Sequence, residues 1–204
     1  MELKELKPSP LVARFVKKIQ KGPVLDIGFG SGKDFLFLAS QGFKVTALDI
    51  DKKAVENLEK LEKESGLEIE IKNQDTRQFS FPENYYAGVI VMNSLFFISR
   101  NDFLSIIEKI KHALQPDNIA IISSFTKDDS MFTQIQQTRK EKQEREFRDD
   151  KGNSWYFLAP KELENLFRDF SILFSKEEQV QDKGHSDSPE PHTHLIAQMV
   201  AKKV

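Results

Sequence analysis

The feature that most constrains the fold is a short apolar strand that runs directly into a glycine-rich turn. The apolar run Val24–Ile27 predicts a buried strand, and a helical pattern begins at Lys33. Between them lie glycines at alternate positions, namely Gly28, Gly30 and Gly32. Glycine permits a tight turn and lets backbone amides come close to a ligand. A strand, turn and helix of this kind predict a nucleotide-like ligand at the carboxyl end of the strand.

A second signal follows one crossover later. The next predicted strand, Lys44–Leu48, is followed by Asp49, which lies 21 positions after Gly28. An acid at the end of this strand is placed to accept hydrogen bonds from both hydroxyls of a ribose.

Strands and helices alternate as far as Phe125, which predicts right-handed crossovers and a mostly parallel sheet. Helices are expected near residues 11–19, 33–41, 51–65 and 102–114, and further strands near 67–71, 86–92 and 119–123. The segment LQPDN is expected to end the last of these helices, and Asp51 and Asp102 are expected to cap helices. Two final strands, within 170–179 and 194–201, are expected to form a closing hairpin.

A dinucleotide is the first competing ligand. Its fingerprint requires glycine or alanine three positions after the second glycine, where this chain has Lys33. The phosphates would also meet Asp26, which is an unfavourable anion for them. S-adenosylmethionine carries no phosphate, and its ammonium group would be attracted by Asp26, directly or through water. The residues therefore favour S-adenosylmethionine.

At this point the chain resembles the class I S-adenosylmethionine-dependent methyltransferases over roughly residues 22–125. The segment LDIGFGSGKDFLFLASQGFKVTALDI is most similar to the tellurite-resistance-type, small-molecule branch. The resemblance implies a doubly wound three-layer α/β sandwich. Its seven-stranded sheet has the order 3-2-1-4-5-7-6 and an antiparallel closing strand. One domain is expected for residues 1–204, with a cofactor part at 22–125, a substrate-side insertion and cover at 126–160 and a closing hairpin at 170–204.

The resemblance also implies the cofactor contacts. The three glycines would surround the methionine and ribose, Asp49 would bind the ribose, and Ile50 would lie on the adenine. Asp75, with Thr76 beside it, would contact the adenine amino group, whereas Asn93 and Ser94 would border the transferred methyl. Phe29 occupies a position that is commonly Cys, Ala or Thr, which suggests a reshaped methionine pocket. From the residues alone, Asp75 also reads as a turn residue, and Asn93 and Ser94 as the end of a strand.

Three of the four histidines fall in GHSDSPEPHTHL, at His185, His192 and His194. The expected hairpin brings this segment to the carboxyl edge of the sheet, beside the mouth of the cofactor crevice. A general base or substrate-orienting role is one interpretation. A metal site is another, because His192 and His194 share a strand face. A polar surface loop is the third. The PHTH segment resembles some tellurite-type relatives, so we predict these three histidines as catalytic residues and predict no metal.

Composition limits the partners. The formal charge is −2, without the strongly basic surface of most nucleic-acid binders, so a small-molecule methyl acceptor is expected and nucleic acid is disfavoured. The chain has no cysteine, which excludes a catalytic thiol and favours a reducing compartment. Its longest apolar runs are too short for a membrane span, so a cytoplasmic location is expected. The oligomeric state is left open.

Methyl transfer to a small molecule is the expected function. The alternatives are a catalytically silent, cofactor-binding regulatory protein and a protein or RNA methyltransferase. The charged stretch Arg139–Lys151 is expected to be a solvated helix face or a mobile cover. Phe96 and Phe97 are expected in the core.

Overall fold

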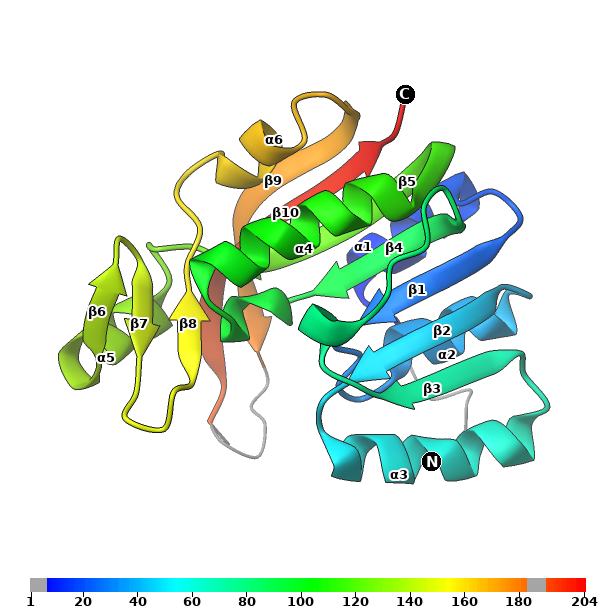
Figure 1. Ribbon diagram of the computed structural model, residues 1–204, viewed down its shortest axis with the longest axis horizontal. Helices are drawn as coiled ribbons and strands as arrows, with labels where there is room; N and C mark the ends of the chain where they lie inside the picture. Colours follow the sequence, from blue (N-terminus) through cyan, green and yellow to red (C-terminus); the bar gives the residue numbers. More distant parts are fainter. Residues whose placement is uncertain (1–6, 183–189) are drawn as a thin grey trace.

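A seven-stranded sheet lies at the centre of the molecule in the order β3-β2-β1-β4-β5-β10-β9 (Figure 1). The computed structural model describes residues 7–182 and 190–204, with the side chains of 60–65 left out. The strands are β1 Pro23–Ile27, β2 Lys44–Asp49, β3 Ile69–Asn73, β4 Tyr86–Met92, β5 Leu114–Phe125, β9 Ser171–Asp182 and β10 His192–Lys202. β10 is antiparallel to both of its neighbours, and the pairs among the other strands are parallel. The predicted fold class and strand order are confirmed.

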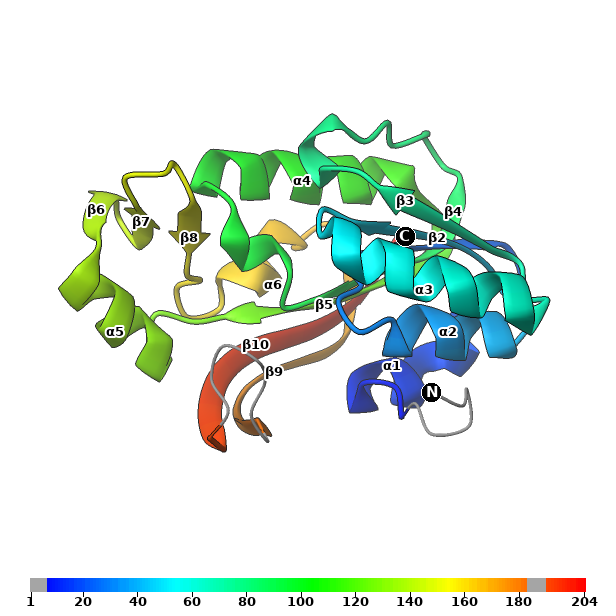
Figure 2. The ribbon, with the colours of Figure 1, turned by 90° about the horizontal axis from the view of Figure 1, so that it is seen from below.

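Helices cover both faces of the sheet and make three layers (Figure 2). Their bounds are α1 Pro10–Phe15, α2 Lys33–Ser40, α3 Lys52–Ser65, α4 Arg100–Ala113, α5 Ser130–Thr138 and α6 Glu162–Leu166. α4 and α6 pack on one face of the sheet, and α1, α2 and α3 pack on the other. β4 lies between the two layers: Val89 and Val91 face α4, whereas Ile90 faces the opposite layer. This burial on both faces explains its continuous apolar run.

The apolar stripe of α4 shows why the helix forms where the sequence predicted it. Phe103, Ile106, Ile107 and Ile110 follow helical spacing, and at most 1% of each is exposed. The helix begins one turn earlier than expected, because Ser99 is its N-cap. The Ser99 hydroxyl accepts from the Asp102 amide at 3.1 Å and donates to the Asp102 carboxylate at 2.8 Å. The prediction that Asp102 is the cap was therefore wrong.

Two further expectations are corrected by the structure. α4 ends directly before LQPDN as expected, but the strand that was expected from Ile119 already begins at Leu114. Within this early part of β5, Asp117 takes a left-handed φ of 63° and the pairing with β4 shifts register. The segment Arg139–Lys151 is not a helix face. It contributes β6 Lys140–Gln143 and β7 Glu146–Arg148, which join β8 Ser154–Tyr156 in a small antiparallel sheet. The side chains of Phe147 and Tyr156 are fully buried and anchor this sheet.

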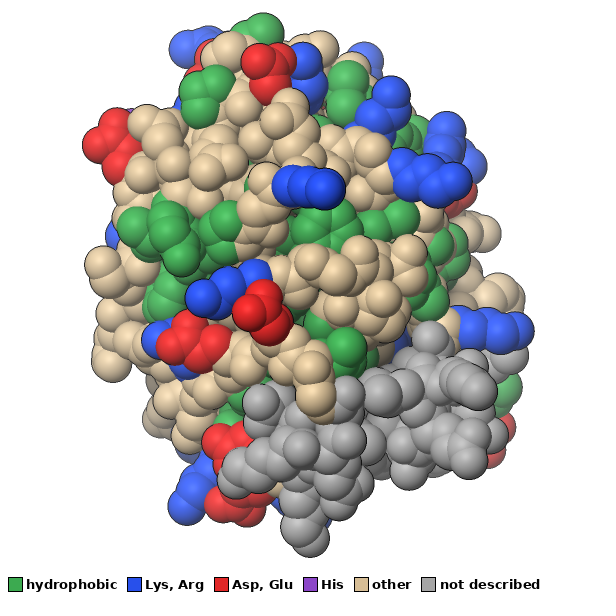
Figure 3. Space-filling model, turned by 90° about the vertical axis from the view of Figure 1, so that its right-hand side faces the viewer, with side chains coloured by type: hydrophobic (Ala, Val, Ile, Leu, Met, Phe, Trp, Pro, Cys, Tyr) green, Lys and Arg blue, Asp and Glu red, His purple; other side chains and the backbone are tan. Residues whose placement is uncertain are grey.

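Figure 3 shows the edge of the main sheet where the parallel strands begin, opposite to their carboxyl ends. Basic and acidic side chains both occur on this face, with apolar surface between them. The face is therefore not uniformly basic. Among the described residues, no helix is long and apolar enough to cross a bilayer.

A buried polar contact fastens the start of the chain to α2. The Ser9 amide and hydroxyl donate to the two oxygens of Asp34 at 2.6 and 2.7 Å, and both residues are buried. The substitution Ser9→Ala removes one donor from a buried carboxylate, which costs about 1–3 kcal/mol of unfolding free energy. Urea unfolding checks this value. Ser40→Ala is the matched control, because the Ser40 side chain is exposed on the same helix and bonds only locally. We expect a change within about 0.5 kcal/mol for it; equal effects of the two substitutions would contradict the prediction.

Candidate functional site

A cleft of about 690 Å³ opens at the carboxyl edge of the parallel strands. This volume is in the range of small-molecule sites. Its walls come from the ends of β1, β2 and β4, from the turn after β3, and from the loop that leads into β8. The lining residues are Ile27, Gly28, Gly30, Asp49, Ile50, Asp51, Gln74, Asp75, Thr76, Arg77, Met92, Asn93, Ser94, Leu95, Phe97, Ile98, Gly152, Asn153, Ser154 and Trp155.

The glycine turn is held tightly against the neighbouring strands. The Gly28 amide donates to the Leu48 carbonyl at 2.7 Å, and the Ser94 hydroxyl donates to the Ile27 carbonyl at 2.6 Å. A Cβ on Gly28 would lie only 2.2 Å from the Ser94 Cβ, so a side chain is excluded there. A Cβ on Gly30 would meet no atom within 4 Å. The turn thus packs at Gly28 and leaves space at Gly30 for a ligand.

Asp49 joins the glycine turn to the turn that precedes α3. Its Oδ2 accepts from the Gly30 amide at 2.9 Å, and its Oδ1 accepts from the Asp51 amide at 2.9 Å. An ionised carboxylate has about four acceptor sites. Each oxygen therefore keeps capacity for a hydroxyl donor from the cleft, and the two amide bonds fix its direction.

Asp26 lies behind the glycine turn and is only 2% exposed. Burial, reinforced by the nearby Asp34 and Asp49 carboxylates, raises the pKa of the Asp26 carboxyl well above its ordinary value. Its Oδ2 atom has no hydrogen-bond partner. Such a group is costly unless a donor or a cation reaches it. Asp26 is not among the residues that line the cleft, so a ligand would reach it between turn and strand or through water.

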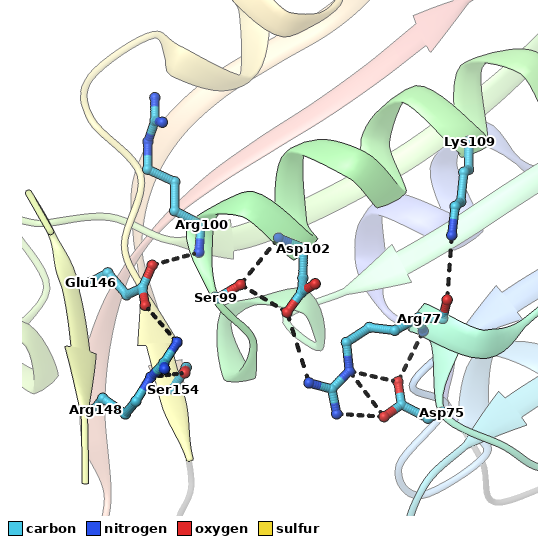
Figure 4. A network of polar contacts seen from close by, with 9 residues as sticks. All are labelled: Asp75, Arg77, Ser99, Arg100, Asp102, Lys109, Glu146, Arg148 and Ser154. Atoms are coloured by element: carbon cyan, nitrogen blue, oxygen red, sulfur yellow. Dashed lines mark hydrogen bonds and ion pairs between the residues drawn. The ribbon is translucent and has the colours of Figure 1, made fainter. Parts of the chain in front are cut away.

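Asp75 follows β3 and is held by Arg77 (Figure 4). The guanidinium donates to both carboxylate oxygens of Asp75, at 3.0 Å from Nε to each and at 2.5 Å from Nη2 to Oδ2. This hydrogen bonding lowers the pKa of the Asp75 carboxyl. The Arg77 Nη1 atom also lies 3.8 Å from the Asp102 Oδ2 atom, in the first turn of α4. The Asp75 side chain also accepts from the Arg77 amide, so this residue starts a 3-10 turn and lines the cleft as well.

Asn93 and Ser94 end β4 at the floor of the cleft. Asn93 has a left-handed φ of 54°, and its Oδ1 accepts from the Ser123 hydroxyl at 2.8 Å. This bond and the Ser94 bond to β1 fix the strand end against both neighbouring strands. The unusual backbone of Asn93 turns the chain out of the sheet at the place where a ligand would lie.

Two of the predicted cofactor residues support the turn from behind. Phe29 is 7% exposed and packs edge-on against Phe35, with ring centroids 5.1 Å apart. Gly32 begins α2, and a Cβ there would lie 2.8 Å from Leu58. Neither residue is among those that line the cleft. Ile50 and Thr76 do line it, and Ile50 is 69% exposed.

The sequence reasoning missed the wall opposite the glycine turn. Phe97 was expected in the core, but it is 60% exposed and lines the cleft, whereas Phe96 beneath it is buried as expected. Trp155 lines the same wall from β8. Adjacent phenylalanines in a short 3-10 turn point in different directions, so the FF pair was a usable signal for one exposed ring.

A chain of polar contacts holds the small sheet beside the cleft (Figure 4). Glu146 is almost fully buried, and its carboxylate accepts from the Arg100 amide at the start of α4 at 2.9 Å. It also accepts from Arg148 at 3.2 Å, and Arg148 donates to the Ser154 hydroxyl at 3.2 Å. A carboxylate is favourable at a helix N-terminus. This docking places the loop before β8 over the cleft.

Of the predicted histidines, His192 and His194 lie outside this wall. The described lining residues include neither His192 nor His194, and His185 lies outside the described residues. His194 packs against Phe125, whose ring lies 4.5 Å from that of Phe96. Ring contacts through Phe125 and Phe96 thus connect His194 to Phe97 of the cleft wall. The catalytic role of the histidines stays a prediction.

Comparisons with known proteins agree with this geometry. Residues 24–117 match the family model of a methyltransferase domain. A ubiquinone biosynthesis O-methyltransferase of Rickettsia conorii is 33% identical over 121 residues, covering 58% of this chain and 41% of that protein. TehB of Haemophilus influenzae has a TM-score of 0.74 at 20% identity, covering 95% of this chain and 61% of that one. A SAM-dependent methyltransferase of Methanosarcina mazei has a TM-score of 0.76 at 22% identity, covering 98% of this chain and 99% of that one.

The chain therefore has the α/β fold of S-adenosylmethionine-dependent methyltransferases. Within the chain, the similarity to the methyltransferase-domain model spans residues 24–117. The predicted resemblance is confirmed, including its likeness to TehB of the tellurite-resistance type. The chain spans about two fifths of the Rickettsia relative and about three fifths of TehB, so these likenesses do not extend to their whole lengths.

The tight packing at Gly28 generates a double-substitution test. We expect Gly28→Ala to lower the unfolding free energy by about 3 kcal/mol or more, since backbone strain adds to the overlap with Ser94. Gly30→Ala carries only the left-handed strain, about 1–2 kcal/mol. Adding Ser94→Gly to Gly28→Ala should restore about 1 kcal/mol or more, because the two effects couple. Denaturant unfolding of the natural chain, the single variants Gly28→Ala and Ser94→Gly, and the double variant measures this coupling, and strict additivity would contradict the assigned contact.

Proposed function

We propose that this chain is a methyltransferase that takes its methyl group from S-adenosylmethionine and transfers it to a small-molecule acceptor. The observation that carries the proposal is the joint between the glycine turn and Asp49. There the Gly30 amide orients a carboxylate beside open space at the carboxyl edge of the sheet. The matched methyltransferase domain includes this joint.

The charges of the site fit this cofactor. Asp49, Asp51 and Asp75 line the cleft, and Asp26 lies buried behind it. Arg77 is the basic residue among the described lining residues, and it is paired with Asp75. A pyrophosphate would meet these carboxylates and be repelled. A ligand with a sulfonium, an ammonium and a ribose is matched instead.

The roles of the chain's own residues follow from these positions. Asp49 would accept hydrogen bonds from the ribose hydroxyls. The unpartnered oxygen of Asp26 would attract the ammonium group, and exposed Ile50 would cover one face of the adenine. Bound S-adenosylmethionine supplies an activated methyl on sulfur, so alignment and exclusion of water account for much of the acceleration.

The acceptor would lie between the end of β4 and the aromatic wall. Asn93 and Ser94 form the floor on one side, and Phe97, Ile98 and Trp155 form the other. The described lining residues include no histidine. Among the described residues, this wall therefore presents no base with an ordinary pKa near neutral pH. We propose an apolar or aromatic small molecule whose nucleophile is soft or already anionic.

The absence of a histidine among the described lining residues also fits one alternative function. This alternative is a cofactor-binding regulatory protein without catalysis. Turnover of methyl-labelled S-adenosylmethionine with thiol, phenol and metalloid-oxyanion acceptors separates the two functions. Binding without turnover across all acceptors would favour the regulatory protein. The cytoplasmic location stays a prediction.

The ribose contact yields a direct binding prediction. Asp49→Ala should weaken S-adenosylmethionine binding by about 10- to 150-fold, because hydrogen bonds to a charged group contribute about 1.5–3 kcal/mol. Isothermal titration calorimetry measures the change. Asp128→Ala is the matched control, since Asp128 is exposed and pairs with Lys127 outside the cleft. Unchanged affinity in Asp49→Ala, with the fold intact, would sink the proposed cofactor site.

The buried carboxyl yields a pH prediction. A folded pKa above the unfolded value means that stability is fully present below the unfolded pKa, near 4, and is lost as pH rises through the folded pKa. Asp26→Asn removes this loss. The unfolding free energy of the Asp26→Asn variant, taken relative to that of the natural chain, should therefore increase with pH across that window. The variant should also bind S-adenosylmethionine more weakly than the natural chain does.

Melting curves between pH 4 and 9 and titrations with S-adenosylmethionine at each pH test this pair of effects. For the natural chain, affinity should rise with pH as the Asp26 carboxyl ionises. A stability difference that does not depend on pH would contradict the assignment.

A further inference from the structure

A second cluster of polar side chains lies at the start of β10, outside the described lining of the cleft. Asp129 is buried at the start of α5, and its carboxylate contacts the His194 Nδ1 atom at 3.1 and 3.3 Å. The His194 Nε2 atom lies 2.9 Å from the Nε2 atom of His192. The His192 Nδ1 atom lies 2.8 Å from the Glu190 carbonyl oxygen.

The partners of the two Nδ1 atoms determine the state of the two rings. A carboxylate and a backbone carbonyl can only accept hydrogen bonds, so both Nδ1 atoms must carry a proton. In neutral rings both Nε2 atoms then present lone pairs, and these face each other at 2.9 Å. Two lone pairs at this distance repel unless a cation lies between them. The cation is either a shared proton or a metal ion.

A third ligand distinguishes these two cations. Asp182 is the cross-strand partner of His192, and the ligand atoms of Asp182, His192 and His194 all lie within 4.8 Å of one another. Two imidazoles and a carboxylate are a donor set that zinc binds at about 2.0–2.2 Å. We propose that these three side chains form a binding site for a divalent transition-metal ion of the zinc type.

The surroundings resemble those of a built metal site. His194 is only 7% exposed, and the Asp129 carboxylate also accepts from the Met131 amide at 2.8 Å and the Leu195 amide at 2.5 Å. Asp129 is thereby fixed, and it orients the His194 ring with Nε2 toward the site. A carboxylate behind a metal-ligating histidine is a recurrent arrangement that raises ligand basicity. Asp129 is a positioning residue in this account.

The distances require only a small adjustment. Two nitrogens bound to one tetrahedral zinc ion lie roughly 3.3 Å apart, given bonds of about 2.0–2.1 Å. The two Nε2 atoms are at 2.9 Å, so the rings would separate by a few tenths of an ångström. His192 and Asp182 are only partly buried, so these two ligands lie near the protein surface.

Such an ion would fasten the β9–β10 hairpin to the start of α5. Asp129 follows the end of β5, and His194 packs against Phe125 of that strand with ring centroids 4.7 Å apart. Phe125 in turn supports Phe96 under the acceptor wall. The site would stabilise this wall without entering the cleft, so its existence does not depend on the proposed methyl transfer.

The test uses the full chain without an affinity tag, stripped of metal by a chelator. Calorimetric titration with Zn²⁺ should show one ion per chain, and Co²⁺ should give the visible absorption of a low-symmetry nitrogen and oxygen site. His194→Gln and His192→Gln should each weaken Zn²⁺ binding by about 100-fold or more. Asp182→Asn and Asp129→Asn should weaken it by about 10- to 100-fold. His112→Gln is the matched control, because His112 is exposed on α4. This variant should bind Zn²⁺ as tightly as the natural chain does.

Zn²⁺ should also raise the melting temperature of the stripped natural chain, because a ligand that binds only the folded state stabilises it. This measurement holds even if a histidine variant fails to fold. Absence of stoichiometric Zn²⁺ binding would overturn the proposal and leave a proton shared by the two rings. Binding that persists in both histidine variants would equally overturn it.

Discussion

The rest of the site depends on how the glycine turn is held between β2 and β4. The Gly28 amide bonds to the end of β2, and Ser94 at the end of β4 bonds to the carbonyl just before the turn. A side chain at Gly28 is excluded because Ser94 already fills the space. Contacts within the chain therefore set the conformation of the turn. Preorganisation of this kind reduces the ordering cost of binding.

The same joint concentrates negative charge where backbone amides would otherwise favour an anion. The Gly30 amide is occupied by Asp49, and Asp26 is held behind the turn with one oxygen unpartnered. A glycine-rich turn before a helix commonly binds phosphate. In the proposed function, these two carboxylates would reverse that preference and favour a cationic ligand with hydroxyl groups. The raised pKa of Asp26 is the physical sign of an anion without its counter-charge.

Much of the fold could be predicted because local patterns and packing agree. The apolar run of β4 was predicted to the residue, since burial on both faces leaves no alternative register. The first part of β5 was missed because Asp117 takes a left-handed conformation that the LQPDN pattern reads as a loop. The small sheet at 140–156 was missed because its outward charged residues conceal two buried anchors, Phe147 and Tyr156. Of the residues predicted from the glycine turn, Gly28, Gly30 and Asp49 line the cleft, whereas Asp26, Phe29 and Gly32 lie behind it, and their role toward a cofactor stays a prediction. The acceptor wall depends on tertiary contacts: the FF pair indicates one exposed ring, but neither its place beside the cleft nor its pairing with Trp155 follows from a short motif.

A crystal structure of the chain with S-adenosylhomocysteine, the demethylated cofactor, tests the central claim most directly. The account predicts both ribose hydroxyls within hydrogen-bond distance of the Asp49 carboxylate. It also predicts the adenine against Ile50, and the ammonium group directed toward Asp26 past Gly30. The sulfur would then face Asn93 and the aromatic wall. Density for the ligand at another surface, or a ribose that makes no contact with Asp49, would contradict the account.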